Sequence, residues 1–292
     1  MKKITLLLFL STSYIFSNIN TVVSILPEQT FVKAIGGDKV NVSLMVQPGN
    51  SPHTYEPKPS QMIDIAKADL YFAIGVEFED VWLPKFKNLN SKMKIIDLTD
   101  KIKKIQMQKA QSNTCTSEEH AGHAHHGHDH EGDDPHIWTS PGNVKIIAQN
   151  IYDTLVKNDA KNKAYYKKNL EIFLASIDET DSQVSHILST LQKSRKFMVF
   201  HPSWGYFAKA YNLDQIAVEV EGKEPKPKEL IHLLKEAKKE EVNAIFTQPE
   251  FSDTVAQIIA KELQIPVVKV SPLSPDWSQT LIKIANTIVG NK

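Results

Sequence analysis

Residues 160–192 read AKNKAYYKKNLEIFLASIDETDSQVSHILSTLQ, and this stretch decides the architecture. It contains no glycine or proline, and its apolar residues recur every three or four positions, which is the period of one helix face. These apolar residues are Tyr166, Leu170, Phe173, Leu174, Ile177, Val184, Ile187, Leu188 and Leu191. We therefore expect one continuous helix of about 33 residues, roughly 50 Å long at the usual rise per residue.

On both sides of this helix, short β-rich runs alternate with helical patterns. Such alternation is typical of parallel sheets that are covered by helices on both faces. The expected strands are 21–26, 40–46, 70–74 and 94–98 before the long helix, and 197–200, 216–220, 244–246 and 267–270 after it. The expected helices are 27–36, 59–68, 144–157, 205–211, 227–239, 253–263 and 276–289. The sequence therefore predicts an α/β fold class, with two (β/α)-type lobes of mostly parallel sheets joined by a long backbone α-helix.

The first 17 residues, MKKITLLLFLSTSYIFS, have the pattern of a secretory signal peptide. Two lysines precede an apolar run from Ile4 to Phe16, and Ser17 is a small residue suited to cleavage. The run is shorter than the roughly 20 residues that span a bilayer; a buried N-terminal helix is the alternative. No cysteine follows the run, so we expect no lipid anchor there. The mature protein is expected in the periplasm, with the signal peptide cleaved near Ser17.

The rest of the chain is expected to form three segments. Residues 18–143 form an N-terminal α/β lobe, residues 144–193 a helical segment that includes the linking helix, and residues 194–292 a C-terminal α/β lobe. Within the first lobe, residues 108–132 are polar and rich in glycine and histidine, which predicts a disordered loop. Its stretch 120–130 holds six of the eleven histidines. This stretch is either a low-affinity collector or sensor of metal ions or a tolerated insertion with incidental metal affinity.

The charge balance and the cysteine content exclude several classes of protein. Lysine plus arginine and aspartate plus glutamate each number 34, so the formal net charge is zero. A nucleic-acid-binding protein needs a basic surface, and Arg195 is the single arginine that could make bidentate phosphate contacts. The single cysteine, Cys115, excludes a disulfide framework and a cysteine-rich metal site. We therefore expect no nucleic-acid partner.

Three histidines outside the histidine-rich stretch lie beside prolines at strand ends or in loops. They are His53 in SPHTYEP (51–57), His136 in DPHIW (134–138) and His201 in HPSWGYF (201–207). Imidazole is the commonest protein ligand for divalent transition metals, and three of them suit Zn²⁺ best. Spacing alone does not show that they converge, so three unrelated polar loop residues are the alternative. His186 and His232 fall within expected helices and are interpreted as surface or packing residues.

These three motifs resemble those of the metal-specific solute-binding proteins of ABC importers, in particular their ZnuA-like zinc branch. The resemblance covers essentially the whole mature chain in the same order. It implies two lobes joined by a rigid helix, with Zn²⁺ held in the cleft between them as the transported ligand. His53, His136 and His201 match the positions of the metal ligands. Manganese-type members usually replace one histidine with glutamate, whereas this chain has histidine at all three positions.

The sequence does not determine the fourth metal ligand. Many relatives have an aspartate where this chain has Ser271, and a neutral hydroxyl is a poor zinc ligand beside a carboxylate. Water, a histidine of the loop or Glu56 could take the position, and we expect water.

The expected function is capture of zinc and its delivery to an ABC-type permease with a cytoplasmic ATPase, by a monomer that is not an enzyme. A manganese- or iron-binding homologue, an adhesin and a zinc chaperone are alternatives. A zinc hydrolase is a further alternative, because three histidines plus water also describe a catalytic zinc. However, the sequence has no His-Glu-x-x-His signature.

Two further features have structural interpretations. The acidic stretch from Glu219 to Pro225 follows a strand and is expected to be a solvated loop. Trp138 and Trp204 lie close to candidate ligands, and each either walls the cleft or packs inside a lobe.

Overall fold

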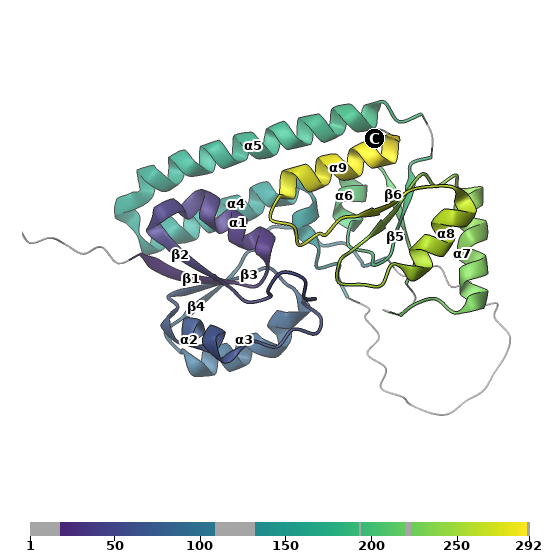
Figure 1. Ribbon diagram of the computed structural model, residues 1–292. Coiled ribbons are helices and arrows are strands. Elements are labelled where there is room, and N and C mark those ends of the chain that lie inside the picture. The colour runs from purple at the N-terminus through teal and green to yellow at the C-terminus, as the bar shows by residue number, and fades with distance from the viewer. Residues whose placement is uncertain (1–17, 109–131, 193, 220–222, 291–292) are drawn as a thin grey trace, which may run out of the picture.

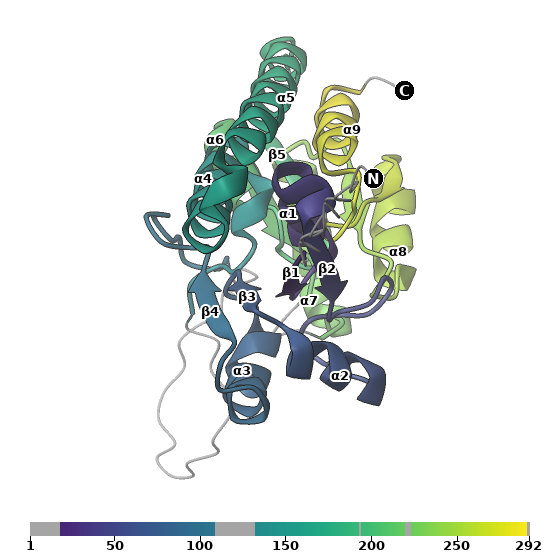
Figure 2. The ribbon, with the colours of Figure 1, turned by 90° about the vertical axis from the view of Figure 1, so that its left-hand side faces the viewer.

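The computed structural model describes residues 18–108, 132–192, 194–219 and 223–290. The expected signal peptide and the histidine-rich stretch lie outside the described residues. In the N-terminal lobe four parallel strands pair in the order β2-β1-β3-β4. The strands are β1 (Ile19–Val23), β2 (Val40–Leu44), β3 (Leu70–Ala73) and β4 (Lys94–Asp97). Helices α1 (Leu26–Gly36) and α4 (Pro141–Asn158) cover one face, and α2 (Pro59–Lys67) and α3 (Glu77–Leu89) cover the other (Figures 1 and 2).

The C-terminal lobe repeats this plan, with parallel strands in the order β6-β5-β7-β8. Its strands are β5 (Lys196–Val199), β6 (Asp214–Ala217), β7 (Ile245–Thr247) and β8 (Val267–Lys269). Its helices are α6 (Gly205–Ala210), α7 (Pro227–Lys239), α8 (Thr254–Leu263) and α9 (Trp277–Val289). The predicted α/β fold class with two mostly parallel sheets is confirmed.

The linking helix α5 (Lys163–Ser189) contains 27 residues and is therefore about 40 Å long. It is shorter than expected because residues 160–162 form a separate 3₁₀ turn and because the helix ends at Ser189 rather than at residue 192. Figure 1 shows it running along both lobes. The Asn169 side chain donates to the Ile35 carbonyl of α1 at 3.0 Å, and Thr180 donates to Ser278 of α9 at 2.8 Å. The helix is thus bonded to both lobes.

The first strand and helix α3 also differ from expectation. The first strand ends at Val23 rather than at Leu26, because Glu28 in the first turn of α1 accepts a hydrogen bond from the Ser24 backbone N–H at 2.9 Å. Helix α3 has no counterpart in the expected pattern, and Pro84 in its interior masks the helical signal. It starts immediately after the turn that follows β3.

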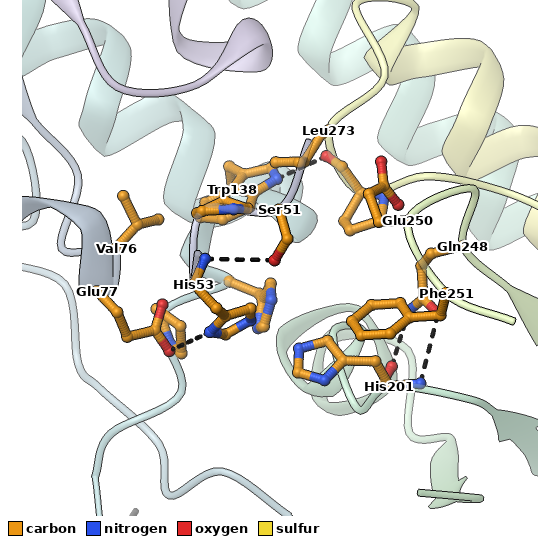
Figure 3. A pocket seen from close by; sticks show the side chains of 14 residues that line it. Ser51, His53, Val76, Glu77, Trp138, His201, Gln248, Glu250, Phe251 and Leu273 are labelled. Atoms are coloured by element: carbon orange, nitrogen blue, oxygen red, sulfur yellow. Dashed lines mark hydrogen bonds and ion pairs between the residues drawn. The ribbon is translucent and has the colours of Figure 1, made fainter. Parts of the chain in front are cut away.

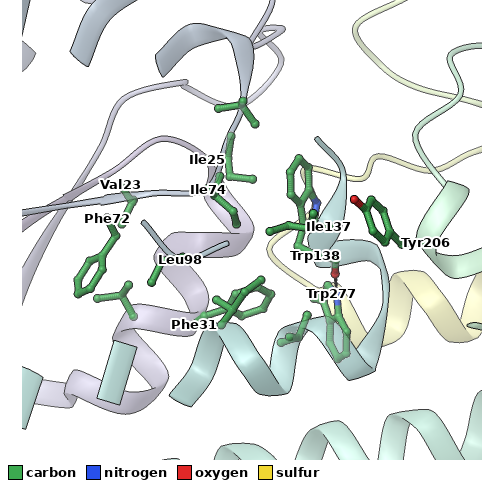
Figure 4. Close-up of a cluster of buried hydrophobic side chains, with 14 of the residues drawn as sticks. Val23, Ile25, Phe31, Phe72, Ile74, Leu98, Ile137, Trp138, Tyr206 and Trp277 are labelled. Atoms are coloured by element: carbon green, nitrogen blue, oxygen red, sulfur yellow. Dashed lines mark hydrogen bonds between the residues drawn. The ribbon is translucent and has the colours of Figure 1, made fainter. Parts of the chain in front are cut away.

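The segment 134–138, which precedes α4 and α5, is hydrogen-bonded to the C-terminal lobe. The indole of Trp138 donates to the Pro272 carbonyl at 2.8 Å, and the indole of Trp277 donates to the Trp138 carbonyl at 2.7 Å. The Tyr206 hydroxyl donates to the Asp134 carbonyl at 3.0 Å. Figure 4 shows these aromatic side chains beside the apolar residues of the N-terminal lobe. One hydrophobic cluster therefore runs from the first sheet through the linking helices to the second sheet.

Within the described ranges, no helix combines the length and the apolar content that crossing a bilayer requires.

The buried face of α5 yields a test of how the lobes are held. Ile177→Ala should lower the free energy of unfolding of the metal-free protein by about 2–5 kcal/mol, because this fully buried side chain leaves a cavity. The matched control is Ile172→Ala on the same helix, where the side chain is 60% exposed; its effect should stay within about 0.5 kcal/mol. Urea unfolding followed by circular dichroism measures both. Equal effects would show that this face does not carry the packing.

Candidate functional site

The three histidines of the sequence motifs converge between the two lobes. His53 comes from the loop after β2, His136 immediately precedes the 3₁₀ turn Ile137–Thr139, and His201 follows β5. The ring centroid of His201 lies 5.2 Å from that of His53 and 5.3 Å from that of His136. All three line a small cavity of ≈ 30 Å³, whose walls include Trp138 and Phe251 (Figure 3). The structure thus brings together residues that are far apart in the chain.

His136 is fixed by Asp134, two residues before it. The Asp134 Oδ1 atom accepts hydrogen bonds from His136 Nδ1 at 2.8 Å and from the His136 backbone N–H at 2.9 Å. The exposed fractions of the two side chains are 8% and 1%. A buried carboxylate therefore sets the orientation of this ring.

His201 is fixed by Glu219, which lies just after the end of β6, the strand that pairs with β5. His201 Nδ1 and Glu219 Oε1 are 2.8 Å apart, and both side chains are buried. The expectation of a solvated acidic loop was therefore wrong for Glu219, while residues 220–222 lie outside the described part. Burial lowers the pKa of His201, and this effect outweighs the hydrogen bond with Glu219, which acts to raise it. The His201 ring stacks on Phe251, with ring centroids 5.2 Å apart.

His53 is the accessible member of the three. Its Nδ1 lies 3.3 Å from Glu77 Oε1, and the exposed fractions of the two side chains are 32% and 33%. The hydrogen bond with Glu77 raises the pKa of His53 against the opposing effect of burial. Burial acts to raise the pKa of Glu77, but the hydrogen bond and the charge of His53 outweigh it and lower that pKa to about 2. Glu77 was not predicted from the sequence because it is the first residue of α3, and the apolar pattern did not indicate that helix.

The three pairs share one chemical consequence. A carboxylate at Nδ1 makes that nitrogen the N–H donor, so that Nε2 carries the free lone pair when the ring is neutral. His201 Nε2 is buried without a hydrogen-bond partner among the described residues, as are Asp134 Oδ2 and Glu219 Oε2. An unsatisfied buried polar atom costs about 1–3 kcal/mol. A cation bound at Nε2 would use the lone pair and compensate the buried carboxylates.

The arrangement is not a closed coordination sphere. In the described part of the chain, no three histidine, cysteine, aspartate or glutamate side chains already stand as a complete set of metal ligands. An ion at this place therefore requires ring movements. His53 has the most freedom to make them, because the other two rings are almost fully buried.

Ser271 does not line the cavity of the three histidines. It lines a neighbouring cavity of ≈ 350 Å³, where its hydroxyl donates to Glu250 Oε1 at 3.3 Å. Glu56 is exposed and is not a lining residue of either cavity. Water as the fourth ligand stays a prediction.

Trp138 and Trp204 differ in their relation to the cavity. Trp138 forms a wall of the cavity, whereas Trp204 packs in the interior, edge-on to Phe207. His186 on α5 and His232 on α7 are exposed helical residues, as expected.

Comparisons with known proteins identify the family of the chain. The profile of the family described as ZnuA, "Zinc-uptake complex component A periplasmic", matches residues 21–290. The high-affinity zinc uptake system protein ZnuA of Bacillus subtilis (strain 168) is 31% identical over 248 residues, which cover 84% of this chain and 75% of that protein. The manganese ABC transporter substrate-binding lipoprotein PsaA of Streptococcus pneumoniae is 27% identical over 247 residues, covering 80% and 73% of the two chains.

Comparison of the fold with solved structures indicates the same family. A crystal structure of ZnuA is similar to this structure with a TM-score of 0.83 and 39% sequence identity, covering 94% of this chain and 99% of that one. The profile spans nearly all of the described residues, and the resemblance seen in the sequence motifs is confirmed. The chain belongs to the ZnuA family of substrate-binding proteins of metal ABC transporters.

Proposed function

We propose that this protein captures Zn²⁺ in the periplasm and delivers it to an ABC permease with a cytoplasmic ATPase. The Nε2 atoms of His53, His136 and His201 are the proposed protein ligands. The observation that carries this proposal is that all three rings meet at one small cavity, each with Nδ1 bonded to a carboxylate. Histidines that bind metal are typically held in this way, because a bonded Nδ1 orients the ring and makes Nε2 more basic.

The donor chemistry supports zinc over manganese. Manganese favours carboxylate and water oxygens, whereas imidazole suits zinc, which also binds more tightly in the Irving–Williams order. Among the described residues that line the cavity, the carboxylates are those of Glu77 and Glu250. Glu77 is bonded to His53 and Glu250 to Ser271. Three nitrogen donors therefore dominate the proposed site.

The size of the cavity supports transport over catalysis. A volume of ≈ 30 Å³ has room for an ion with about one water molecule. A hydrolase would need space for its substrate beside the metal-bound water. Water as the fourth ligand and a monomer as the functional unit remain part of this proposal.

Metal titration tests the choice of ion. Metal-free protein lacking residues 116–131, which removes the weak sites expected in the histidine-rich stretch, should bind one Zn²⁺ tightly and Mn²⁺ more weakly by orders of magnitude. Isothermal titration calorimetry with a competing chelator measures the stoichiometry and both affinities. Manganese binding that equals or exceeds zinc binding would contradict the assignment.

Alanine substitution tests the three ligands. In the same shortened protein, His53→Ala, His136→Ala and His201→Ala should each lower zinc affinity by orders of magnitude, because two imidazoles make an incomplete site. In the unsubstituted protein, zinc at 1,000 times its Kd should stabilise the fold by about 4 kcal/mol, seen as a rise in melting temperature. His186→Ala and His232→Ala are the controls and should keep the full rise. If His201→Ala also keeps it, the site does not bridge the lobes.

The role of Glu219 has a control in the same stretch of chain. Glu219→Gln should lower zinc affinity about 10- to 100-fold, as is typical when the carboxylate partner of a ligand histidine is changed. Glu224→Gln removes the same charge from an exposed position and should leave the affinity unchanged. Competition with a chromophoric chelator measures both variants. Equal affinities would mean that Glu219 does not act through His201.

A further inference from the structure

The backbone of Gly205 packs directly against the carboxylate that holds His136. A Cβ atom on Gly205 would lie 2.5 Å from Asp134 Oδ2, far inside van der Waals contact. It would also lie 3.3 Å from Gln215 Nε2 and 3.3 Å from Ile105 Cδ1. Gly205 is not among the described glycines with positive φ. Glycine is therefore needed here to leave space for the carboxylate, and backbone conformation does not require it.

Asp134 is held in place by hydrogen bonds and by burial. Its Oδ1 accepts both hydrogen bonds from His136, and its backbone N–H donates to the Ile105 carbonyl at 2.7 Å. Its own carbonyl accepts from the Tyr206 hydroxyl at 3.0 Å. The side chain is 1% exposed, so it cannot turn into solvent. Moving Oδ2 away from residue 205 would therefore move Oδ1 away from the His136 ring.

The other two neighbours of this position lie farther from the added atom, each at 3.3 Å. Gln215 is buried, and its Oε1 accepts from the Trp204 backbone N–H at 3.0 Å. Ile105 Cδ1 is the end of an apolar side chain and needs to shift by only a few tenths of an ångström. The steric clash of a side chain added at residue 205 is therefore relieved mainly by displacement of the Asp134 carboxylate. Among the described glycines, Gly205 is the one whose added Cβ would meet a carboxylate bonded to a site histidine.

We propose that Gly205 is a positioning residue of the metal site: the absence of a side chain lets Asp134 reach His136 Nδ1 and hold Nε2 toward the cavity. This inference rests on the proposed zinc-binding function. Gly205 touches no metal itself, and it acts through Asp134 on His136.

The first experiment compares two alanine substitutions in the full chain lacking only residues 116–131. Gly205→Ala should lower zinc affinity about 10- to 100-fold, the usual effect of disturbing the partner of a ligand histidine. Gly142→Ala in α4 is the matched control, because its Cβ would meet only Ser140 Oγ at 3.8 Å, an ordinary contact. The control should bind zinc like the parent protein. Wild-type affinity in Gly205→Ala would overturn the inference.

A spectroscopic readout separates positioning from a general loss of stability. The ligand-field absorption of the Co²⁺-loaded protein reports the geometry around the ion. We expect it to change in Gly205→Ala and to be unchanged in Gly142→Ala. An unchanged spectrum in Gly205→Ala would contradict a displaced His136.

A double substitution tests the pathway through Asp134 and also covers the case in which Gly205→Ala does not fold. Asp134→Ala removes the atom that clashes, so adding Gly205→Ala to it should not lower zinc affinity further. The double variant should fold and bind like Asp134→Ala. A weaker or unfolded double variant would show that the added methyl acts elsewhere, and the inference would fail. If the unsubstituted protein itself binds no zinc tightly, the proposed function fails instead.

Discussion

Hydrogen bonds from histidine Nδ1 to carboxylates are the interactions on which the candidate site depends. Each bond places a proton on Nδ1, so that Nε2 carries the lone pair when the ring is neutral, and Asp134 and Glu219 make these bonds from buried positions. A buried carboxylate is costly unless it is bonded, so the rest of the fold has to bring donor and acceptor together accurately. Glu219 reaches His201 because β5 and β6 are paired neighbours that end at the same edge of the sheet.

The two lobes use equivalent sheet edges for different tasks. In both sheets the chain order reverses between the two central strands, β1 and β3 in one lobe and β5 and β7 in the other, and ligands of open α/β sheets bind at such points. In the C-terminal lobe this point holds His201, whose carbonyl accepts from Gln248 at 2.9 Å. In the N-terminal lobe it holds Glu79, which accepts from the Ile74 and Gly75 backbone N–H groups at 2.9 and 2.8 Å and from the Ser24 hydroxyl. Burial raises the pKa of Glu79 to about 7. This carboxylate fixes the start of α3 and so places Glu77 beside His53.

The sequence predicted where the strands and the linking helix lie along the chain and singled out the three histidines as candidate ligands, because each of these depends on local signals. Strands and helices follow from the period of apolar residues, and the histidines stand out because they lie beside prolines at strand ends or in loops. Glu77 and Glu219 escaped prediction because their partners lie 24 and 18 positions away in sequence and become neighbours only through strand pairing and an unpredicted helix. Glu219 also lies in a stretch with other acids, which favours a solvated interpretation. Asp134 is two residues from His136, so a local signal for that pair was present.

The packing limits how the site can adapt to an ion. One hydrophobic cluster is continuous from Phe72 of the first sheet through Ile177 of α5 to Phe246 of the second sheet. Trp138 and Trp277 add hydrogen bonds that bind the segment of His136 to the C-terminal lobe, so His136 and His201 belong to one tightly packed unit. His53 lies on a loop of the other lobe and is the partly exposed ring. A movement of one lobe relative to the other would disrupt that continuous core. Turning the His53 ring toward the ion disturbs only its hydrogen bond with Glu77. The proposed site is therefore two imidazoles held in place and a third that turns to bind the ion beside them.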